Sequence, residues 1–427
     1  MVVDGWGRGH STPHVEQCSS PGPASCATRP GASPYTSPVR DFAELLRTPG
    51  LARVMASQLA ARLPAGMFSL GMLMHVEHVQ GNYTSAGTVL AAFSIGMAAA
   101  GPVITRQLNR YGTLPVLLTC LLVTTASLTP LVIFQLPLWA MTLLAAVAGA
   151  TIPPVQPTVR TLYPKLVPQH LVTPLFSLDA ALQEIIWVLG PVVITALVVY
   201  LGTVTALLVV TGIQLAGGML FILVPAVRGL RIPRATGRFG KVLANPSVLL
   251  MTLASLLLIG SLAAMEAAVV AWFGEGSLLG GIVLAISALG SMIGGLAIGQ
   301  RPISPWSLPA RMLVMTLGLV AAVLVSGFWG LALALFVAGL GTAPSIAAIS
   351  SVIAGSVPFA DTAEAYGWIT TGQLIGAAAG SALAGIAIDS LGGGRGGMLA
   401  SLTIGALAVL ATAAFRNTQP DLRNTHS

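Results

Sequence analysis

Twelve long apolar stretches between residues 51 and 415 constrain this chain more than any other feature. A helix of about 20 residues, rising 1.5 Å per residue, crosses the roughly 30 Å hydrocarbon core of a bilayer. Open strands cannot satisfy their backbone polar groups in lipid, so each stretch is expected to be helical. The expected spans are 51–75, 84–105, 114–135, 138–162, 174–200, 203–225, 247–273, 278–300, 308–327, 329–355, 362–390 and 396–415. The sequence therefore predicts an all-α integral membrane protein with about 12 transmembrane helices.

The composition excludes a water-soluble protein. Charged residues make up 8% of the chain and hydrophobic residues 55%, whereas soluble domains carry roughly 25% charged residues. The formal net charge of +7 does not indicate a nucleic-acid partner, because the cations lie in short connections between apolar stretches and form no basic domain. The lipid bilayer is the expected surrounding.

The positions of the positive charges predict the topology. Of the 20 Lys and Arg residues, 18 fall on the side of the N-terminus, including Arg160 and Arg311, while Arg395 falls on the other side and Arg62 inside the first stretch. Positive residues near membrane helices are retained in the cytoplasm. We therefore expect a multi-pass protein of the cell (inner) membrane, with an even number of helices and both termini cytoplasmic.

The chain is expected to contain two six-helix bundles. A Pro-, Ser- and Gly-rich segment, 1–45, is predicted to be a disordered cytoplasmic tail without a signal peptide. The N-terminal bundle covers 46–227, a basic cytoplasmic linker 228–245, the C-terminal bundle 246–415 and a cytoplasmic tail 416–427.

The two halves also match each other weakly in sequence. A shift of 190 residues places Pro168 on Pro358, Gln183 on Gln373 and Gly190 on Gly380, and a shift of 191 places Pro153 on Pro344. Transporters built from parallel repeats, which bind their substrate between the halves, show internal symmetry of this kind.

The connection after the second stretch carries the clearest motif. It contains Gly101, Asn109, Arg110 and Gly112, and it resembles the loop motif of the major facilitator superfamily, a glycine followed by Asp-Arg-x-Gly. Arg110 and Gly112 match the motif, whereas Asn109 stands where the family usually has Asp. The resemblance, over roughly residues 45–415, implies two pseudo-symmetric six-helix bundles. It also implies that the loop controls the conformational cycle.

The fifth stretch carries a partial second motif. Gly190 and Pro191 resemble the Gly-Pro portion of the superfamily's antiporter motif, without its flanking glycines. The fourth stretch has Pro153 and Pro154 and lacks the arginine of proton-coupled drug antiporters. These features resemble efflux-type facilitators from actinobacteria, and they imply export.

Arg62 and Glu184 are expected at similar depth near the middle of the membrane. A charge there costs at least about 2.5–3.5 kcal/mol, so each should face the protein interior or water and find a partner. An Arg62–Glu184 ion pair is the simplest expectation. Two interpretations stay open: a proton-coupling or gating pair, or a static pair that locks the N-terminal bundle.

Other polar residues are weaker candidates for transport or coupling. Glu266 is expected close to the outer interface, where its carboxylate can reach water. A set of uncharged amides can line a cavity or join helices by hydrogen bonds: Gln58, Gln156, Gln183, Gln214 and Gln373. Glycines in the eighth and eleventh stretches indicate close helix packing, and they would also suit a sliding interface.

The sequence contains no phosphate-binding loop and no soluble ATP-binding domain, and His75 and His78 are too weak a pattern for a metal site. We therefore expect no cofactor, no metal and no enzymatic activity. The leading hypothesis is a secondary transporter that exports a small organic molecule in exchange for protons. The alternatives are a nutrient uptake symporter of the same superfamily and, with less support, a membrane-embedded enzyme. No feature of the sequence indicates an oligomeric state.

Overall fold

The computed structural model describes residues 43–45, 47–233, 238–274, 277–299 and 301–422. Most of the predicted N-terminal tail, 1–42, and the last residues, 423–427, lie outside this description, as do Arg234 and Glu275. Residues 43–45 are helical and Leu45 is buried.

All twelve predicted spans are helices long and apolar enough to cross a membrane. The first half comprises α2 (Leu51–Arg62), α3 (Ala65–Gln80), α4 (Tyr83–Tyr111), α5 (Thr113–Ile133), α6 (Leu138–Ala150), α7 (Val155–Leu166), α8 (Gln169–Leu201) and α9 (Thr203–Ile222). The second half comprises α11 (Pro246–Phe273), α12 (Leu278–Ile298), α13 (Ser307–Leu324), α14 (Phe328–Ser356), α15 (Phe359–Leu391) and α16 (Gly393–Ala414). Between the halves lie α10 (Pro225–Arg228) and the 3₁₀ turn η1 (Lys241–Ala244), and the turn η2 (Arg416–Thr418) follows α16.

Two spans of the first half are broken by prolines. The first span divides into α2 and α3 at Leu63 and Pro64, and the fourth divides into α6 and α7 at Thr151–Pro154. Proline lacks the backbone N–H and clashes with the preceding turn, so it interrupts a helix. Because of these breaks, α2 ends at Arg62 and α7 begins just before Gln156, both inside the bundle.

The long helices α8 and α15 show the predicted duplication. Each has 33 residues, follows a proline and ends at a glycine with positive φ, Gly202 or Gly392, exactly one shift of 190 residues apart in sequence. Gly190 of α8 lies against the backbone of Gly66, and Gly380 of α15 lies against the backbone of Gly260. Each long helix thus makes a glycine-to-glycine contact with the first span of its own half.

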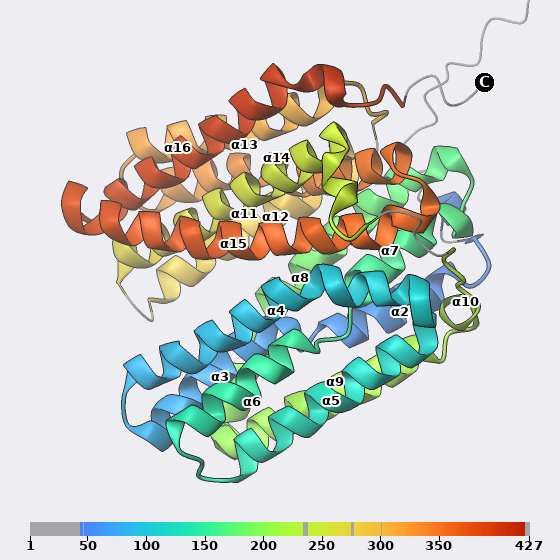
Figure 1. The fold of residues 1–427 in the computed structure, drawn as a ribbon. Coiled ribbons are helices and arrows are strands. Elements are labelled where there is room, and N and C mark those ends of the chain that lie inside the picture. Colours follow the sequence, from blue (N-terminus) through green and yellow to red (C-terminus); the bar gives the residue numbers. More distant parts are fainter. Residues whose placement is uncertain (1–42, 46, 234–237, 275–276, 300, 423–427) are drawn as a thin grey trace, which may run out of the picture. The chain divides into compact units, whose positions relative to one another are not determined.

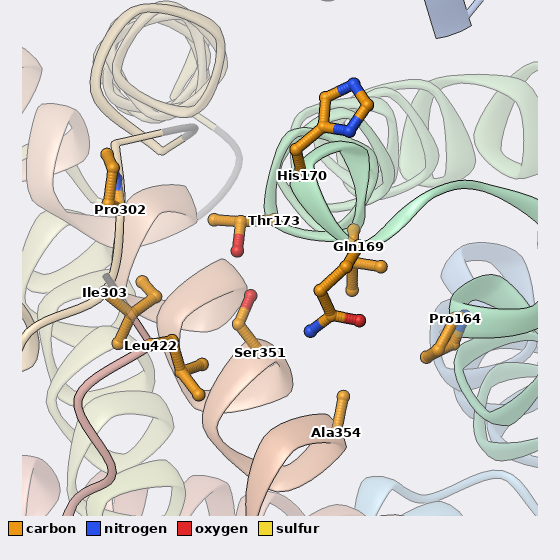
Figure 2. Close-up of a pocket in the computed structure, with 10 residues that line it drawn as sticks. Pro164, Gln169, His170, Thr173, Pro302, Ile303, Ser351, Ala354 and Leu422 are labelled. Carbon is orange, nitrogen blue, oxygen red and sulfur yellow. The ribbon is translucent and has the colours of Figure 1, made fainter. Parts of the chain in front are cut away.

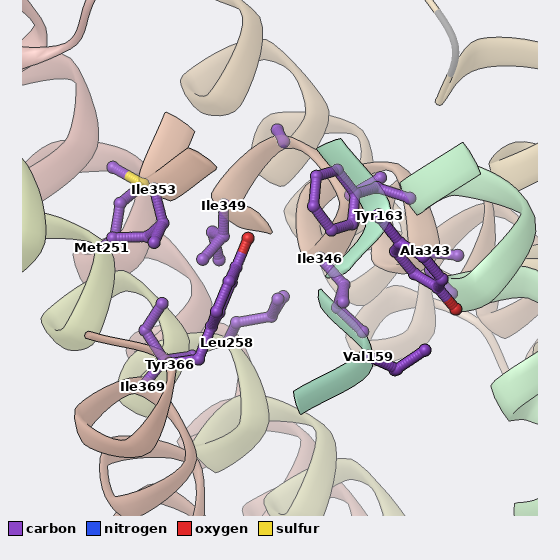
Figure 3. Packing of buried hydrophobic residues seen from close by; sticks show 14 of the residues in the cluster. Val159, Tyr163, Met251, Leu258, Ala343, Ile346, Ile349, Ile353, Tyr366 and Ile369 are labelled. Carbon is purple, nitrogen blue, oxygen red and sulfur yellow. The ribbon is translucent and has the colours of Figure 1, made fainter. Parts of the chain in front are cut away.

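The contacts between the halves lie toward the end of the helices that carries α10 and η1, called here the linker end. There α4 lies beside α15, and α8 packs against α12 and α14 (Figure 1). One continuous apolar core crosses this interface: Figure 3 shows Val159 and Tyr163 of α7 near Ala343 and Ile346 of α14, with Tyr366 of α15 in the same cluster. Among the spans that the structure describes, α4, α8 and α15 are the least buried.

Two cations predicted at the ends of spans are instead buried in helices. Arg160 lies in α7 with 3% of its side chain exposed, and Arg311 lies in α13 with 6% exposed. Arg311 donates hydrogen bonds to the carbonyls of Pro344 and Arg301, at 2.9 and 3.0 Å. The positive-inside pattern counts charges along the chain, and it cannot tell a cation in a connection from one turned inward within a nearby helix.

Candidate buried charge site

Asp179 of α8 is the centre of a buried polar cluster in the first half. Its Oδ1 accepts hydrogen bonds from Gln58 Nε2 at 3.1 Å, Arg62 Nη1 at 3.2 Å and the Tyr163 hydroxyl at 3.0 Å. Its Oδ2 accepts from Arg160 Nε at 3.3 Å. Asp179 is fully buried. Three spans therefore converge on one carboxylate.

Glutamine side chains accept hydrogen bonds from the arginine N–H groups that do not bond to Asp179. Arg62 Nη1 donates to Gln58 Oε1 at 2.9 Å, and Arg62 Nη2 donates to Gln183 Oε1. We assign the Gln156 amide with its oxygen toward Arg160, because this orientation lets it accept from Nη2 at 2.9 Å and from Nη1 at 3.0 Å. Gln58 is fully buried, whereas Gln156 and Gln183 are half-buried. These three glutamines thus accept hydrogen bonds from buried cations, in the place of water.

The expected Arg62–Glu184 ion pair is wrong in this conformation, because the ion partner of Arg62 is Asp179. Both carboxylates lie on α8, five residues apart. That spacing separates them by about 140° around the helix axis. Asp179 consequently faces α2 and α7 in its own half, while Glu184 faces the other half.

Glu184 joins the two halves. Its Oε1 accepts a hydrogen bond from Ser291 Oγ of α12 at 2.8 Å, and Ser291 Oγ in turn accepts from the backbone N–H of Ala343 at 3.1 Å. Pro344 follows within α14. Unlike Asp179, Glu184 has no arginine or lysine within ion-pair distance in the described residues. It is half-buried.

Glu266 and Gln373 lie in the second half. Glu266 of α11 is exposed. Gln373 of α15 is half-buried. Their predicted roles in transport remain predictions.

The loop motif lies at the linker-end contact between α4 and α15. Asn109 is buried and donates a hydrogen bond to the carbonyl of Ala360 of α15. Gly101 lies opposite Thr371, whose hydroxyl donates to the carbonyl of Ala98 at 2.8 Å. The exposed Arg110 lies over the ring of Tyr111, with 5.2 Å from Cζ to the ring centroid.

Gly112 forms the turn between α4 and α5. Its φ of 88° and ψ of 164° belong to a region that is nearly restricted to glycine. The glycine of the motif is therefore required by the backbone, independently of any role in transport.

Arg106 and Glu364 form a second link at this end that sequence reasoning missed. Arg106 Nη1 lies 3.3 Å from Glu364 Oε2, and Glu364 Oε1 accepts from the backbone N–H of Gly240 at 2.8 Å. Arg106 also lies over the ring of Phe239, which packs against Trp368 with ring centroids 5.7 Å apart. The connection between the halves thus takes part in closing the linker end.

The predicted glycine series divides between two kinds of interface. Gly290 and Gly294 of α12 lie against the α14 backbone, and Gly372, Gly376 and Gly380 of α15 lie against α11, all inside the second half. Gly295 lies between Ala343 of its own half and Ala181 of α8, and Gly299, just after α12, lies against Ser177 of α8, across the halves. Close packing explains most of the series. Gly295 and Gly299 belong to the interface that a rocking motion would have to open.

A small hollow lies at the linker end, away from the buried charges. It is bounded by the start of α8, the end of α14 and Leu422, with Gln169, Thr173 and Ser351 around it (Figure 2). Its volume of about 50 Å³ is far below the roughly 300–1,000 Å³ of typical small-molecule sites. It is not a substrate site in this conformation.

Comparison with known proteins identifies the family. The sequence profile of the Major Facilitator Superfamily matches residues 54–306, more than half of the chain. The chain belongs to this superfamily. It is therefore a secondary transporter and not an enzyme. No curated protein sequence matches it.

Solved structures of superfamily transporters share the fold. A bacterial homologue of the iron transporter ferroportin, in an outward-facing state, superimposes with a TM-score of 0.70 at 12% identity, covering 86% of this chain and 99% of that one. The human organic anion transporter MFSD10 gives 0.66 at 16% identity, covering 84% and 98%. The fucose:proton symporter of E. coli gives 0.66 at 16% identity, covering 87% and 99%. At these identities the likeness establishes the fold alone.

Proposed function

We propose that this superfamily member exports a small organic molecule by alternating access, in exchange for protons. The observation that carries the proposal is the position of Glu184, a carboxylate that is hydrogen-bonded across the two halves to Ser291 and has no cationic partner in the described residues. Such a group can gain or lose a proton without breaking an ion pair. A change in its protonation acts directly on a contact between the moving halves.

The contacts at the linker end support an outward-facing state. If the linker is cytoplasmic, as the positive charges indicate, the Asn109–Ala360 and Arg106–Glu364 contacts close the cytoplasmic side. Alternating access then requires these contacts to break while the opposite side closes. The neighbouring ferroportin homologue and one of the fucose symporter structures are also described as outward-facing.

Export rests on the resemblance of Gly190 and Pro191 to the Gly-Pro portion of the superfamily's antiporter motif. An added Cβ at Gly190 would lie within 2.6 Å of the Gly66 backbone, so α8 and α3 approach very closely at the motif that resembles the antiporter pattern. Gly380 of α15 makes the same close approach to Gly260, so this packing is common to both halves.

Reconstituted vesicles with an imposed pH gradient test the proposal. A panel of organic compounds is added while a pH-sensitive dye reports internal pH. If export is exchanged for protons, a transported compound moves in the direction opposite to the protons. Its movement then dissipates the imposed pH gradient. Movement of compound and protons in the same direction would instead establish the uptake symporter. Counterflow of a compound with no proton movement would contradict proton coupling.

A further inference from the structure

The buried cluster around Asp179 has an unbalanced charge. Arg62 and Arg160 are both within ion-pair distance of Asp179, at 3.2 and 3.3 Å, and their exposed fractions are 9% and 3%. The other side chains that bond to these three, which are glutamines and Tyr163, are neutral. The cluster therefore holds two cations and one anion.

No other acid in the described residues compensates for the second arginine. Glu184, the next acid along α8, turns to Ser291 in the opposite half. A buried charge without a counter-charge is costly in a protein interior, and more so at the depth of a membrane. Glutamine dipoles reduce this cost but supply no negative charge.

We propose that this cluster is a binding site for the carboxylate of an organic anion. That the anion is also the transported substrate rests on the function proposed above. One carboxylate would bring the charge of the cluster to neutrality. The planar, forked guanidinium groups match the geometry of a carboxylate, to which they can donate two parallel hydrogen bonds.

Gln156 and Gln183 mark where the anion binds. Their amide oxygens accept the N–H groups of Arg160 and Arg62 that Asp179 does not reach. Both glutamines are half-buried, whereas Gln58 is fully buried. The two half-buried amides occupy the positions that carboxylate oxygens take when the anion displaces them.

Equilibrium binding to the purified protein in lipid nanodiscs tests the inference. The probes are acetate, benzoate and indole-3-acetate, each compared with its neutral amide at constant ionic strength, and also chloride and inorganic phosphate. Ligand-dependent thermal stabilisation gives apparent affinities. We expect benzoate and indole-3-acetate to bind, and their amides and the inorganic anions to bind at least about tenfold more weakly, because a hydrogen bond to a charged group is lost or mismatched.

Two variants supply the missing negative charge from within the protein. Gln156→Glu and Gln183→Glu each place a carboxylate at the proposed anion position, and each should weaken carboxylate binding by about tenfold or more while maintaining or raising thermal stability. Gln80→Glu is the matched control: this half-buried glutamine of α3 bonds to the Leu136 carbonyl, away from the cluster. Two different variants are used so that a folding defect in one does not decide the result.

The inference fails if amides bind as tightly as carboxylates, if chloride or phosphate binds as tightly as the organic acids, or if both glutamate variants bind benzoate like the wild type. Binding is measured without a gradient, so the outcome does not depend on coupling. Carboxylate binding without proton movement in vesicles would overturn the proposed function and leave this site standing. Proton-coupled transport of neutral compounds alone would leave the proposed function standing and overturn this site.

Discussion

Ser291 of α12 donates a hydrogen bond to Glu184 of α8 at 2.8 Å and thereby joins the two halves of the transporter. The same hydroxyl accepts from the Ala343 backbone beside the proline of α14. Glu184 thus lies at a three-helix contact that has to rearrange when the halves move. A proton on its carboxyl group would change which hydrogen bonds this contact can make.

Replacing Glu184 with Gln is expected to abolish accumulation of substrate driven by a pH gradient, while counterflow continues. The amide keeps the size of the side chain and can still accept from Ser291, but it cannot exchange a proton. Transport should be measured with and without an imposed gradient in proteoliposomes. Glu77→Gln, at the far end of α3, is the control and should behave like the wild type. Gradient-driven accumulation by the Glu184→Gln protein would exclude Glu184 as the coupling residue.

Replacing Asp179 with Asn should destabilise the protein by roughly 3–5 kcal/mol, because it leaves two buried arginines without a carboxylate. The double change Arg62→Gln with Asp179→Asn restores the wild-type excess of one positive charge, so it should recover much of this loss. Thermal unfolding in detergent compares the single and double variants, with Arg62→Gln alone completing the cycle. Additive effects would mean that Arg62 and Asp179 do not interact.

The twelve spans could be predicted because hydropathy over about 20 residues is a strong signal. The partner of Arg62 could not, since estimated depth does not say which way a side chain points around its helix. The spacing of Asp179 and Gln183, four residues apart, did carry a signal. It places both on one face of α8, the face to which Arg62 turns.

The buried position of Arg160 could not be predicted from the sequence for a related reason. It lies near the end of a span, where a charge usually reaches water, yet in α7, which begins after Pro153 and Pro154, it bonds to Asp179. The Arg106–Glu364 pair joins residues that are 258 positions apart in sequence. Neither hydropathy nor a local motif can pair residues across two bundles.

Replacing Glu364 with Gln should favour opening of the linker end. The change removes the ion pair with Arg106 and weakens the bond to the Gly240 backbone. Spin labels on Leu114 and Asp361 should report a longer mean distance, or a larger long-distance population, than in the wild type. Asp361, half-buried on the same turn of α15, makes no ion pair among the described residues, so Asp361→Asn with the second label on Phe359 is the control. An unchanged distance distribution would show that the pair does not hold this end closed.

The linker is expected to be cytoplasmic. In a background with Cys18 and Cys26 replaced by Ser, an impermeant thiol reagent added to intact cells should fail to label Lys241→Cys, which is exposed in η1. The same reagent should label Arg395→Cys, exposed at the opposite end of the helices. Labelling of Lys241→Cys but not Arg395→Cys would invert the topology, and with it the outward-facing assignment.

Gly112→Leu tests whether the loop motif controls the conformational cycle beyond shaping the backbone. Any side chain at its φ of 88° and ψ of 164° should cost about 1–3 kcal/mol of stability. Gly202, between α8 and α9, has nearly the same conformation, with φ 79° and ψ 163°, and both positions have open space for a side chain. Gly202→Leu therefore carries a similar strain away from the α4–α15 contact. If the motif acts on the cycle, Gly112→Leu should slow transport far more than Gly202→Leu at equal loss of thermal stability, with substrate binding unchanged in both. Equal slowing in the two variants would reduce the role of Gly112 to that of a turn residue.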